Sequence, residues 1–471
     1  MIYSIFLFLS VNLYATLNRM IKYIVPLLSV FLLSCNETKK ENLTYLGGKI
    51  INPKADFVTL QNHYEELIDT IKLNSDNTFI GSFKNIKEGL YLFRHGSEFQ
   101  YIFLEPQDSL LLRLNTWDFD ESLVFSGSNA EKNNALIENF LINEKQSKDF
   151  YKYYQLNSED FLRTVDSLKV LKDDYLENFI TDYPETSENY IDVLKVALFY
   201  PLFTKLETYS INNRLKEEPE ALKEERFVSH RPEVGINGDS LMFYSPYRNY
   251  VYNNIYYDVY AENVKDESDD FTIAVLETVD DKIESRVLKN RLLKETIIRH
   301  FYTKTSCSLN KQAYNTFSKF STNNADKEEI ACLLTDVKHI PKKKRIPNFK
   351  LFSPQGSMEN IRNIIKGNST VIYFRNKEYS SNKWVASRMN YLINNNPGVK
   401  FMVINMNEDK NEYIKELNIK HQFYLNKESD AHNFLTSRYP RMVLVNKKGV
   451  VVNGFCGLSS KKIEKQITDL Q

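Results

Sequence analysis

The hydrophobic pattern changes its period twice along the chain, and these changes constrain the fold more than any other feature of the sequence. Up to Gly127, short apolar runs recur at the 8 to 12 residue spacing of antiparallel strands. Apolar residues three and four apart follow, and after Ile346 strand-like and helix-like segments alternate. Because 471 residues exceed what one core organises, we expect a multidomain α+β chain: an antiparallel β domain at 44–127, a helical linking domain at 128–340 and an α/β domain at 346–471.

The first segment reads as the strands of a small sandwich or open barrel. The turn 74–77 is expected to form a hairpin, because Asn and Asp tolerate positive φ. The stretch from Leu46 to Ala130 resembles an N-terminal all-β domain of unknown function found in front of envelope thioredoxin-like lipoproteins. Asp69-Thr70, Phe79 and 101–105 are among the residues that carry this resemblance. Six runs are expected to be strands: 57–60, 69–73, 78–83, 90–93, 101–104 and 109–114.

The helical region shows amphipathic stripes. Its clearest stripe runs from Phe161 to Phe179, and others lie at 191–202, 271–288, 293–301 and 313–320. An aromatic-rich stretch at 243–260 could form a stacking platform for sugars or peptides. Its Tyr residues fall at helix periodicity, however, and such a stripe is more often core.

The N-terminus has the layout of a secretory signal. An apolar run at 24–34 follows Arg19 and Lys22 and ends at Cys35. It is shorter than the roughly 20 residues that a spanning helix needs. Leu32-Leu33-Ser34-Cys35 resembles the lipobox of bacterial lipoproteins, which implies acylation of Cys35. Residues 1–35 are then a signal segment with a lipobox, in which the part before Cys35 is removed and Cys35 becomes the mature N-terminus; 1–19 belong either to an upstream start or to a first membrane helix.

The last segment alternates strand, helix, strand, helix, hairpin and helix. Strands are expected at 370–374 and 400–405, a hairpin at 441–452, and helices at 384–394, 409–417 and 459–470. A Pro-x-Phe-x-Leu entry at 347–351, the strand ending in Tyr373-Phe374, and Tyr439-Pro440 before 441–445 resemble the TlpA-like envelope thiol:disulfide proteins. The resemblance implies a thioredoxin-like fold over 346–471 and a cis peptide bond at Pro440.

The same resemblance implies a redox site that this chain does not possess. Redox members place a CxxC pair at the helix N-terminus after the Tyr-Phe strand, where the helix dipole lowers thiol pKa values. Alignment puts Tyr379 and Asn382 at those two positions, and no cysteine occurs between 333 and 455. Ser380 and Ser381 lack an activating base. Cys307, Cys332 and Cys456 are expected to be buried, although a Cys307–Cys332 disulfide stays open.

Composition and motifs exclude several function classes. The 61 basic and 61 acidic residues balance, which argues against nucleic acid as a partner. The seven histidines show no metal-ligand spacing, and there is no dinucleotide, P-loop or nucleophile-elbow motif, so neither metal nor cofactor is expected.

These features predict an envelope lipoprotein that acyl chains on Cys35 hold to a bacterial membrane, the outer membrane on its periplasmic or surface side. Its redox-inactive thioredoxin-like domain would bind an envelope protein or peptide along a groove lined by Tyr379, Ser380, Asn382, Trp384, Tyr439 and Pro440. The alternatives are a thiol:disulfide oxidoreductase with non-standard cysteines such as Cys456, a hydrolase hidden in the helical region, and a purely structural envelope component.

Overall fold

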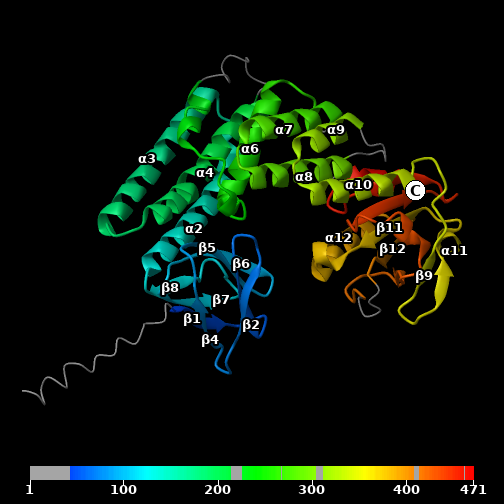
Figure 1. The fold of residues 1–471 in the computed structure, drawn as a ribbon, viewed down its shortest axis with the longest axis horizontal. Helices are drawn as coiled ribbons and strands as arrows, with labels where there is room; N and C mark the ends of the chain where they lie inside the picture. The colour runs from blue at the N-terminus through cyan, green and yellow to red at the C-terminus, as the bar shows by residue number, and fades with distance from the viewer. Residues whose placement is uncertain are drawn as a thin grey trace, which may run out of the picture. The chain divides into compact units, whose positions relative to one another are not determined.

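The structure is a computed structural model that describes residues 43–213, 225–266, 268–303, 311–407, 413–460 and 462–470. Cys35, Cys307 and the segments 1–19 and 24–34 lie outside these ranges. The described chain is mixed α+β and divides into two compact units, one up to Leu141 and the other from Ile142 onward (Figure 1). Among the described helices, none combines the length and the apolar character needed to cross a bilayer.

The first unit contains two four-stranded sheets packed face to face. One sheet has the order β4-β1-β7-β8 and the other β3-β2-β5-β6. Alternating residues such as Leu46, Phe93 and Leu110 fill the shared core, as the period-two pattern predicts. The strands are β1 (Leu43–Ile51), β2 (Phe57–Gln61), β3 (Leu67–Lys72), β4 (Thr78–Lys84), β5 (Gly89–His95), β6 (Glu98–Leu104), β7 (Ser109–Asn115) and β8 (Val124–Gly127).

All six expected strands are present, but two expectations about their pairing are wrong. β1 pairs parallel with β7, so the domain is not purely antiparallel. The sequence did not indicate β1 because Gly47 and Gly48 interrupt its apolar alternation. The turn 74–77 is tight, with Asn77 at φ 64, yet β3 and β4 belong to different sheets. It therefore connects the two layers instead of closing a hairpin.

The second unit begins with long helices, as the three- and four-residue spacing predicts. Helices α3 and α4 lie side by side (Figure 1). The expected stripe at 271–288 is broken, since one helix ends at Lys282 and the next begins at Arg286. The helices are α2 (Ala130–Tyr153, which starts in the first unit), α3 (Ser158–Asp182), α4 (Glu188–Asn213), α6 (Ser245–Ala261), α7 (Asp269–Lys282), α8 (Arg286–Thr303), α9 (Lys311–Phe320) and α10 (Asn324–His339).

The aromatic stripe of α6 is core, as its periodicity predicts. Tyr247, Tyr250 and Asn254 are at most 3% exposed. The alternative, a platform for sugars or peptides, is therefore absent at these three positions, and the rings of Tyr247 and Tyr250 pack against Tyr200 of α4.

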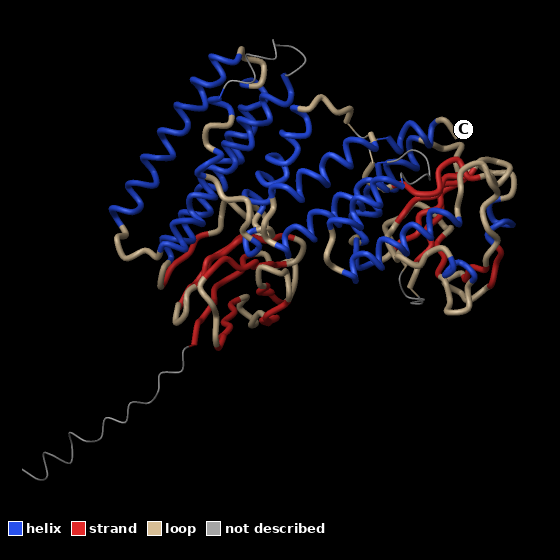
Figure 2. The backbone as a smooth tube through the Cα atoms, turned by 45° about the horizontal axis from the view of Figure 1, so that its top comes forward, coloured by secondary structure: helices blue, strands red, loops and turns tan. Residues whose placement is uncertain are grey.

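The C-terminal part is a seven-stranded sheet with the order β10-β9-β13-β12-β11-β14-β15, drawn in red in Figure 2. β11 runs parallel to β12 and antiparallel to β14, and β15 closes the antiparallel hairpin. Its strands are β9 (Lys350–Phe352), β10 (Met358–Asn360), β11 (Thr370–Arg375), β12 (Lys400–Asn405), β13 (Gln422–Tyr424), β14 (Arg441–Val445) and β15 (Val451–Cys456).

Helices pack with both faces of this sheet. Alternate residues of β11 enter two separate cores, Ile372 and Phe374 one, Val371 and Tyr373 the other. The helices are α11 (Ile361–Ile365), α12 (Asn382–Asn395) and α13 (Lys462–Thr468). The expected helix at 409–417 is wrong where it is described, since 413–417 form turns and loop; residues 409–412 lie outside the described ranges. Three parallel strands (β13, β12 and β11), the antiparallel pair β14 and β15, and helices on both faces form a thioredoxin-like arrangement.

Candidate functional site

The position expected for redox thiols lies between β11 and α12, at the carboxyl end of β11. The side chain of Ser381 caps α12, because its Oγ accepts a hydrogen bond from the Trp384 amide at 3.3 Å. Asn376 caps the preceding 3-10 turn in the same way, through the Glu378 amide. Both short polar residues fix the loop that presents Tyr379 and Asn382.

A buried arginine lies at the centre of this position. Arg375, the last residue of β11, is 3% exposed and donates to the side-chain oxygens of Asn405 at 3.1 Å and Asn382 at 2.5 Å. Ser380 Oγ lies 3.4 Å from the hydroxyl of Tyr373, whose pKa is raised by burial. Asn382, at one of the two positions aligned with thiols, therefore accepts a hydrogen bond from a cation. Sequence reasoning missed Arg375, although a charged residue at the end of a buried strand is a usable signal.

The described cysteines do not meet at this position. Cys456 is 3% exposed on β15, and its Sγ donates to the Met442 carbonyl at 3.4 Å. Met442 pairs in turn with Tyr373, so a whole strand separates Cys456 from β11. Cys332 is partly exposed on α10, where burial was expected, and it forms no disulfide with Cys456. A pairing of Cys332 with Cys307 is outside the described residues.

Pro440 lies beside this loop, but the expectation of a cis bond is wrong. The described residues contain no cis peptide bond. Trans is the isomer that an X–Pro bond prefers by about 0.5–1 kcal/mol, and Arg438, at φ 55, makes the turn that leads into Tyr439. The ring of Tyr439 lies 5.4 Å from that of Tyr379, so these two predicted groove residues do come together.

Helix α8 covers the Pro440 side of the expected groove. The hydroxyl of Tyr302 donates to the Pro440 carbonyl at 2.8 Å, and the Tyr302 ring packs against Phe455. Tyr439 is 5% exposed, and burial, reinforced by Glu329 of α10, raises its pKa. In contrast, Tyr379 and Trp384 are 49% and 43% exposed. Of the residues predicted to line a groove, those on the Tyr379–Trp384 side are thus the accessible ones, and they include the exposed Asn382.

A buried ion pair joins α10 to the same loop. Asp336 and Arg441 are each 1% exposed, and their side chains lie 2.9 Å apart. Burial lowers the pKa of Arg441 against the opposing effect of Asp336. Asp336 also accepts hydrogen bonds from the amides and hydroxyls of Thr436 and Ser437. The sequence did carry a signal: a carboxylate among the apolar positions of α10, near the end of the helix where its dipole disfavours negative charge.

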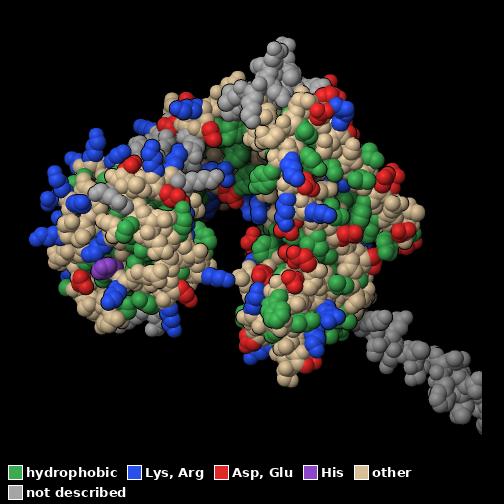
Figure 3. Space-filling view, turned by 180° about the vertical axis from the view of Figure 1, so that it is seen from behind, with side chains coloured by type: hydrophobic (Ala, Val, Ile, Leu, Met, Phe, Trp, Pro, Cys, Tyr) green, Lys and Arg blue, Asp and Glu red, His purple; other side chains and the backbone are tan. Residues whose placement is uncertain are grey.

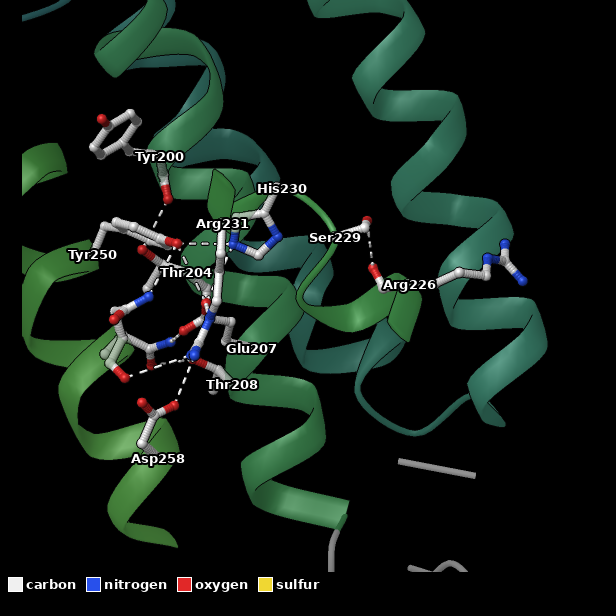
Figure 4. A network of polar contacts seen from close by, with 12 residues as sticks. Tyr200, Thr204, Glu207, Thr208, Arg226, Ser229, His230, Arg231, Tyr250 and Asp258 are labelled. Carbon is white, nitrogen blue, oxygen red and sulfur yellow. Dashed lines mark hydrogen bonds and ion pairs between the residues drawn. The ribbon is translucent and has the colours of Figure 1, made fainter. Parts of the chain in front are cut away.

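A second buried carboxylate organises the helical part (Figure 4). Glu207 of α4 is fully buried, with Arg231 Nε at 2.8 Å and His230 Nε2 at 3.2 Å. Burial favours a higher pKa for Glu207, but hydrogen bonds from His230 and Arg231 outweigh it and hold the pKa below its usual value. Arg231 also forms an ion pair with Asp258 of α6, with its Nη1 2.7 Å from Asp258 Oδ1. These hydrogen bonds and ion pairs connect the segment 225–241 to α4 and α6. They do not place a nucleophile beside a base.

A cavity of about 280 Å³ lies among α6, α7 and α8. Its buried side holds His300, whose Nδ1 lies 2.9 Å from the Thr272 hydroxyl and whose pKa burial lowers to about 4. Within the described ranges, no group of three His, Cys, Asp or Glu residues could hold a metal ion. The full lining is Tyr256, Tyr260, Asp266, Phe271, Thr272, Val275, Thr296, Arg299 and His300.

The C-terminal part also differs from the rest of the chain in charge. Residues 346–471 contain 19 Lys and Arg against 10 Asp and Glu, a net charge of +9 in a chain whose net charge is zero. Lys and Arg side chains are spread over the visible face of this part in the space-filling view (Figure 3, left). The net charge of the whole chain, which is zero, does not reveal this excess of basic residues.

No family model and no curated protein matches the chain. Solved structures similar to it are thioredoxin-like proteins and thiol-disulfide oxidoreductases, and they cover only part of it. A thioredoxin-like protein from Bacteroides caccae is 12% identical with a TM-score of 0.28, covering 57% of this chain and 93% of its own. A protein assigned as a thiol-disulfide oxidoreductase from Bacteroides vulgatus is 15% identical with a TM-score of 0.25, covering 28% of this chain and 98% of its own.

A thiol:disulfide interchange protein from a Bacteroides species is 15% identical with a TM-score of 0.23, covering 28% of this chain and 90% of its own. All three similarities are too low in identity and TM-score to support a functional conclusion. The strand order and directions of the C-terminal sheet are what make this part thioredoxin-like.

Proposed function

We propose that this chain is an envelope lipoprotein, anchored through Cys35, whose thioredoxin-like domain binds an acidic polypeptide instead of exchanging disulfides. The observation that carries the proposal is the Arg375–Asn382 hydrogen bond at the position where a redox site would need thiols. Exchange requires a sulfur nucleophile, and the sequence holds none between 333 and 455.

The proposed contact surface is the groove lined by Tyr379, Ser380, Asn382, Trp384, Tyr439 and Pro440. Exposed Tyr and Trp side chains supply most of the binding energy in many protein interfaces, because they bury a large area at a small entropic cost. Tyr302 already uses the Pro440 carbonyl, so a partner would contact the Tyr379–Trp384 side first. The net charge of +9 favours an acidic partner, since complementary charge speeds association.

The test is site-specific photo-crosslinking in native envelopes. A photoreactive side chain at Tyr379 should capture a discrete partner, and Trp384→Ala in the same chain should reduce the yield at least fivefold. The matched control is Tyr391, which is also an exposed aromatic residue on α12 (48%). Equal capture from positions 379 and 391, or capture that Trp384→Ala leaves unchanged, would count against the groove.

Anchoring through Cys35 is tested separately by mass spectrometry of the membrane-extracted protein. An N-terminal peptide that begins at Cys35 with the mass of attached acyl chains is expected, and Cys35→Ser should abolish it. A peptide from residues 2–19 in the mature protein would contradict removal of the signal.

A thiol oxidoreductase is the second candidate, and one observation favours it. Cys332 is partly exposed on α10, and its carbonyl accepts a hydrogen bond from Thr436 of the loop that leads to Pro440. Reduction of insulin by the wild-type chain, lost in Cys332→Ser or Cys456→Ser, would support this candidate. Absence of turnover in the wild-type chain would remove it.

A further inference from the structure

The outer face of the β4-β1-β7-β8 sheet is open and apolar at its centre. Ile80 and Leu111 lie in one cross-strand row on either side of Gly47, and they are 64% and 45% exposed. A Cβ at Gly47 would lie 3.1 Å from the Leu111 side chain, so the glycine lets the two aliphatic side chains approach. Val124, 57% exposed on β8, extends the patch in the next row.

Basic side chains border this patch on the same face. Lys49 and Arg113 are paired across β1 and β7 and are exposed, in the row that also holds Val124. Lys84 stands at the other end, opposite Leu43. None of the outward positions of these four strands carries an acidic residue. The carboxylate of Asp76, in the turn before β4, interacts electrostatically with Lys49. It also accepts a hydrogen bond from the Thr78 hydroxyl.

We infer that this face lies on an anionic lipid bilayer. Aliphatic side chains surrounded by Lys and Arg are the composition with which peripheral proteins enter the headgroup region, because apolar area and attraction to anionic lipid add. The position of the face is consistent with this occupant. Eight residue steps separate Cys35 from Leu43 at the start of β1, and an extended chain spans at most ~29 Å in that length.

The inference rests on the proposed lipid anchor for its geometry but predicts an affinity that needs no acyl chain. The chain from Asn36 onward, which includes every described residue, is therefore the form to test. It should float with vesicles that contain phosphatidylglycerol and phosphatidylcholine, and at least fivefold less with vesicles of phosphatidylcholine alone. Raising the salt concentration should weaken the binding.

Matched variants locate the contact. Ile80→Asp with Leu111→Asp, and separately Lys49→Glu with Arg113→Glu, should each reduce the bound fraction about tenfold, since every basic contact with anionic lipid adds to the affinity. Leu67→Asp with Lys72→Glu is the control, because both residues are exposed on β3 of the other sheet. Vesicle binding that the control variant reduces equally, or no preference for the anionic vesicles, would overturn the inference.

A second measurement uses the acylated chain. Amide hydrogen exchange in the edge strand β4 should be slower on anionic than on neutral vesicles, and the Ile80→Asp, Leu111→Asp variant should remove the difference. If the chain from Asn36 onward is instead a dimer without lipid, and the same variant makes it monomeric, the face is an interface between copies and the inference is wrong. Neither result bears on acylation, which the mass of the Cys35 peptide decides.

Discussion

Asp336 connects α10 to the loop at residues 436–441, called the Pro440 loop here. It is fully buried, pairs with Arg441 and accepts hydrogen bonds from Thr436 and Ser437. Removing one partner of a buried pair leaves an uncompensated charge. Asp336→Asn should therefore lower the free energy of unfolding by about 3–5 kcal/mol, measured by denaturant titration of Trp384 fluorescence in a Trp117→Phe background.

The paired replacement Asp336→Leu with Arg441→Met is the control for this prediction. It removes both charges at once, so it should cost much less than the single change, because well-packed apolar residues often replace a buried pair without loss. Equal stability of Asp336→Asn and the wild-type chain would show that the pair does not hold the loop.

His300 predicts how stability depends on pH. Burial lowers its pKa to about 4, against an ordinary value near 6.5, with Asp269 Oδ1 3.9 Å away from its Nε2. As the pH falls, His300 therefore takes up its proton in the unfolded chain before it does so in the folded chain. The stabilisation of the folded state by neutral His300 is complete above about pH 6.5 and is lost between about pH 6.5 and 4. The loss is up to about 3 kcal/mol. His300→Gln should flatten this part of the pH profile of unfolding; an unchanged profile would exclude His300 as its source.

At the scale of elements, periodicity predicted most of the fold, and the misses have local causes. Strands with clear alternation, such as β4 and β7, were found at their positions. β1 was missed because two glycines interrupt its pattern, and β13 because three residues give too short a period to detect. Residues 413–417 have helix-forming composition, but only isolated turns form there.

The candidate site was predicted less completely than the fold. The absence of thiols and the positions of Tyr379, Asn382 and Trp384 follow from the sequence alone. The cover of Pro440 by Tyr302 does not, because the two residues are 138 positions apart and no local pattern connects them. The same holds for Asp336 and Arg441. Such long-range pairs depend on how α8 and α10 pack, which periodicity does not encode.

Helix α8 should restrain the Pro440 loop through one hydroxyl. Tyr302→Phe removes the hydrogen bond to the Pro440 carbonyl and keeps the ring contact with Phe455, so it should cost about 0.5–1.5 kcal/mol. Amide hydrogen exchange at residues 436–441 should become faster. Tyr391→Phe, on exposed α12, is the control and should change neither quantity; unaltered exchange in Tyr302→Phe would mean that other contacts alone fix the loop.

At the scale of the whole molecule, the two compact units have separate cores, and each contains one of the two tryptophans, Trp117 in the first and Trp384 in the second. Phe93 is fully buried in the sandwich core. Phe93→Ala should destabilise the first unit by about 3–5 kcal/mol, because it leaves a cavity among close-packed side chains. Fluorescence of Trp117, measured with Trp384→Phe, should report the earlier unfolding. The unfolding midpoint that Trp384 fluorescence reports, measured in a Trp117→Phe background, should stay unchanged. A common shift of both midpoints would instead mean that the units unfold as one cooperative body, with α2, which continues from the first unit into the second, carrying the coupling.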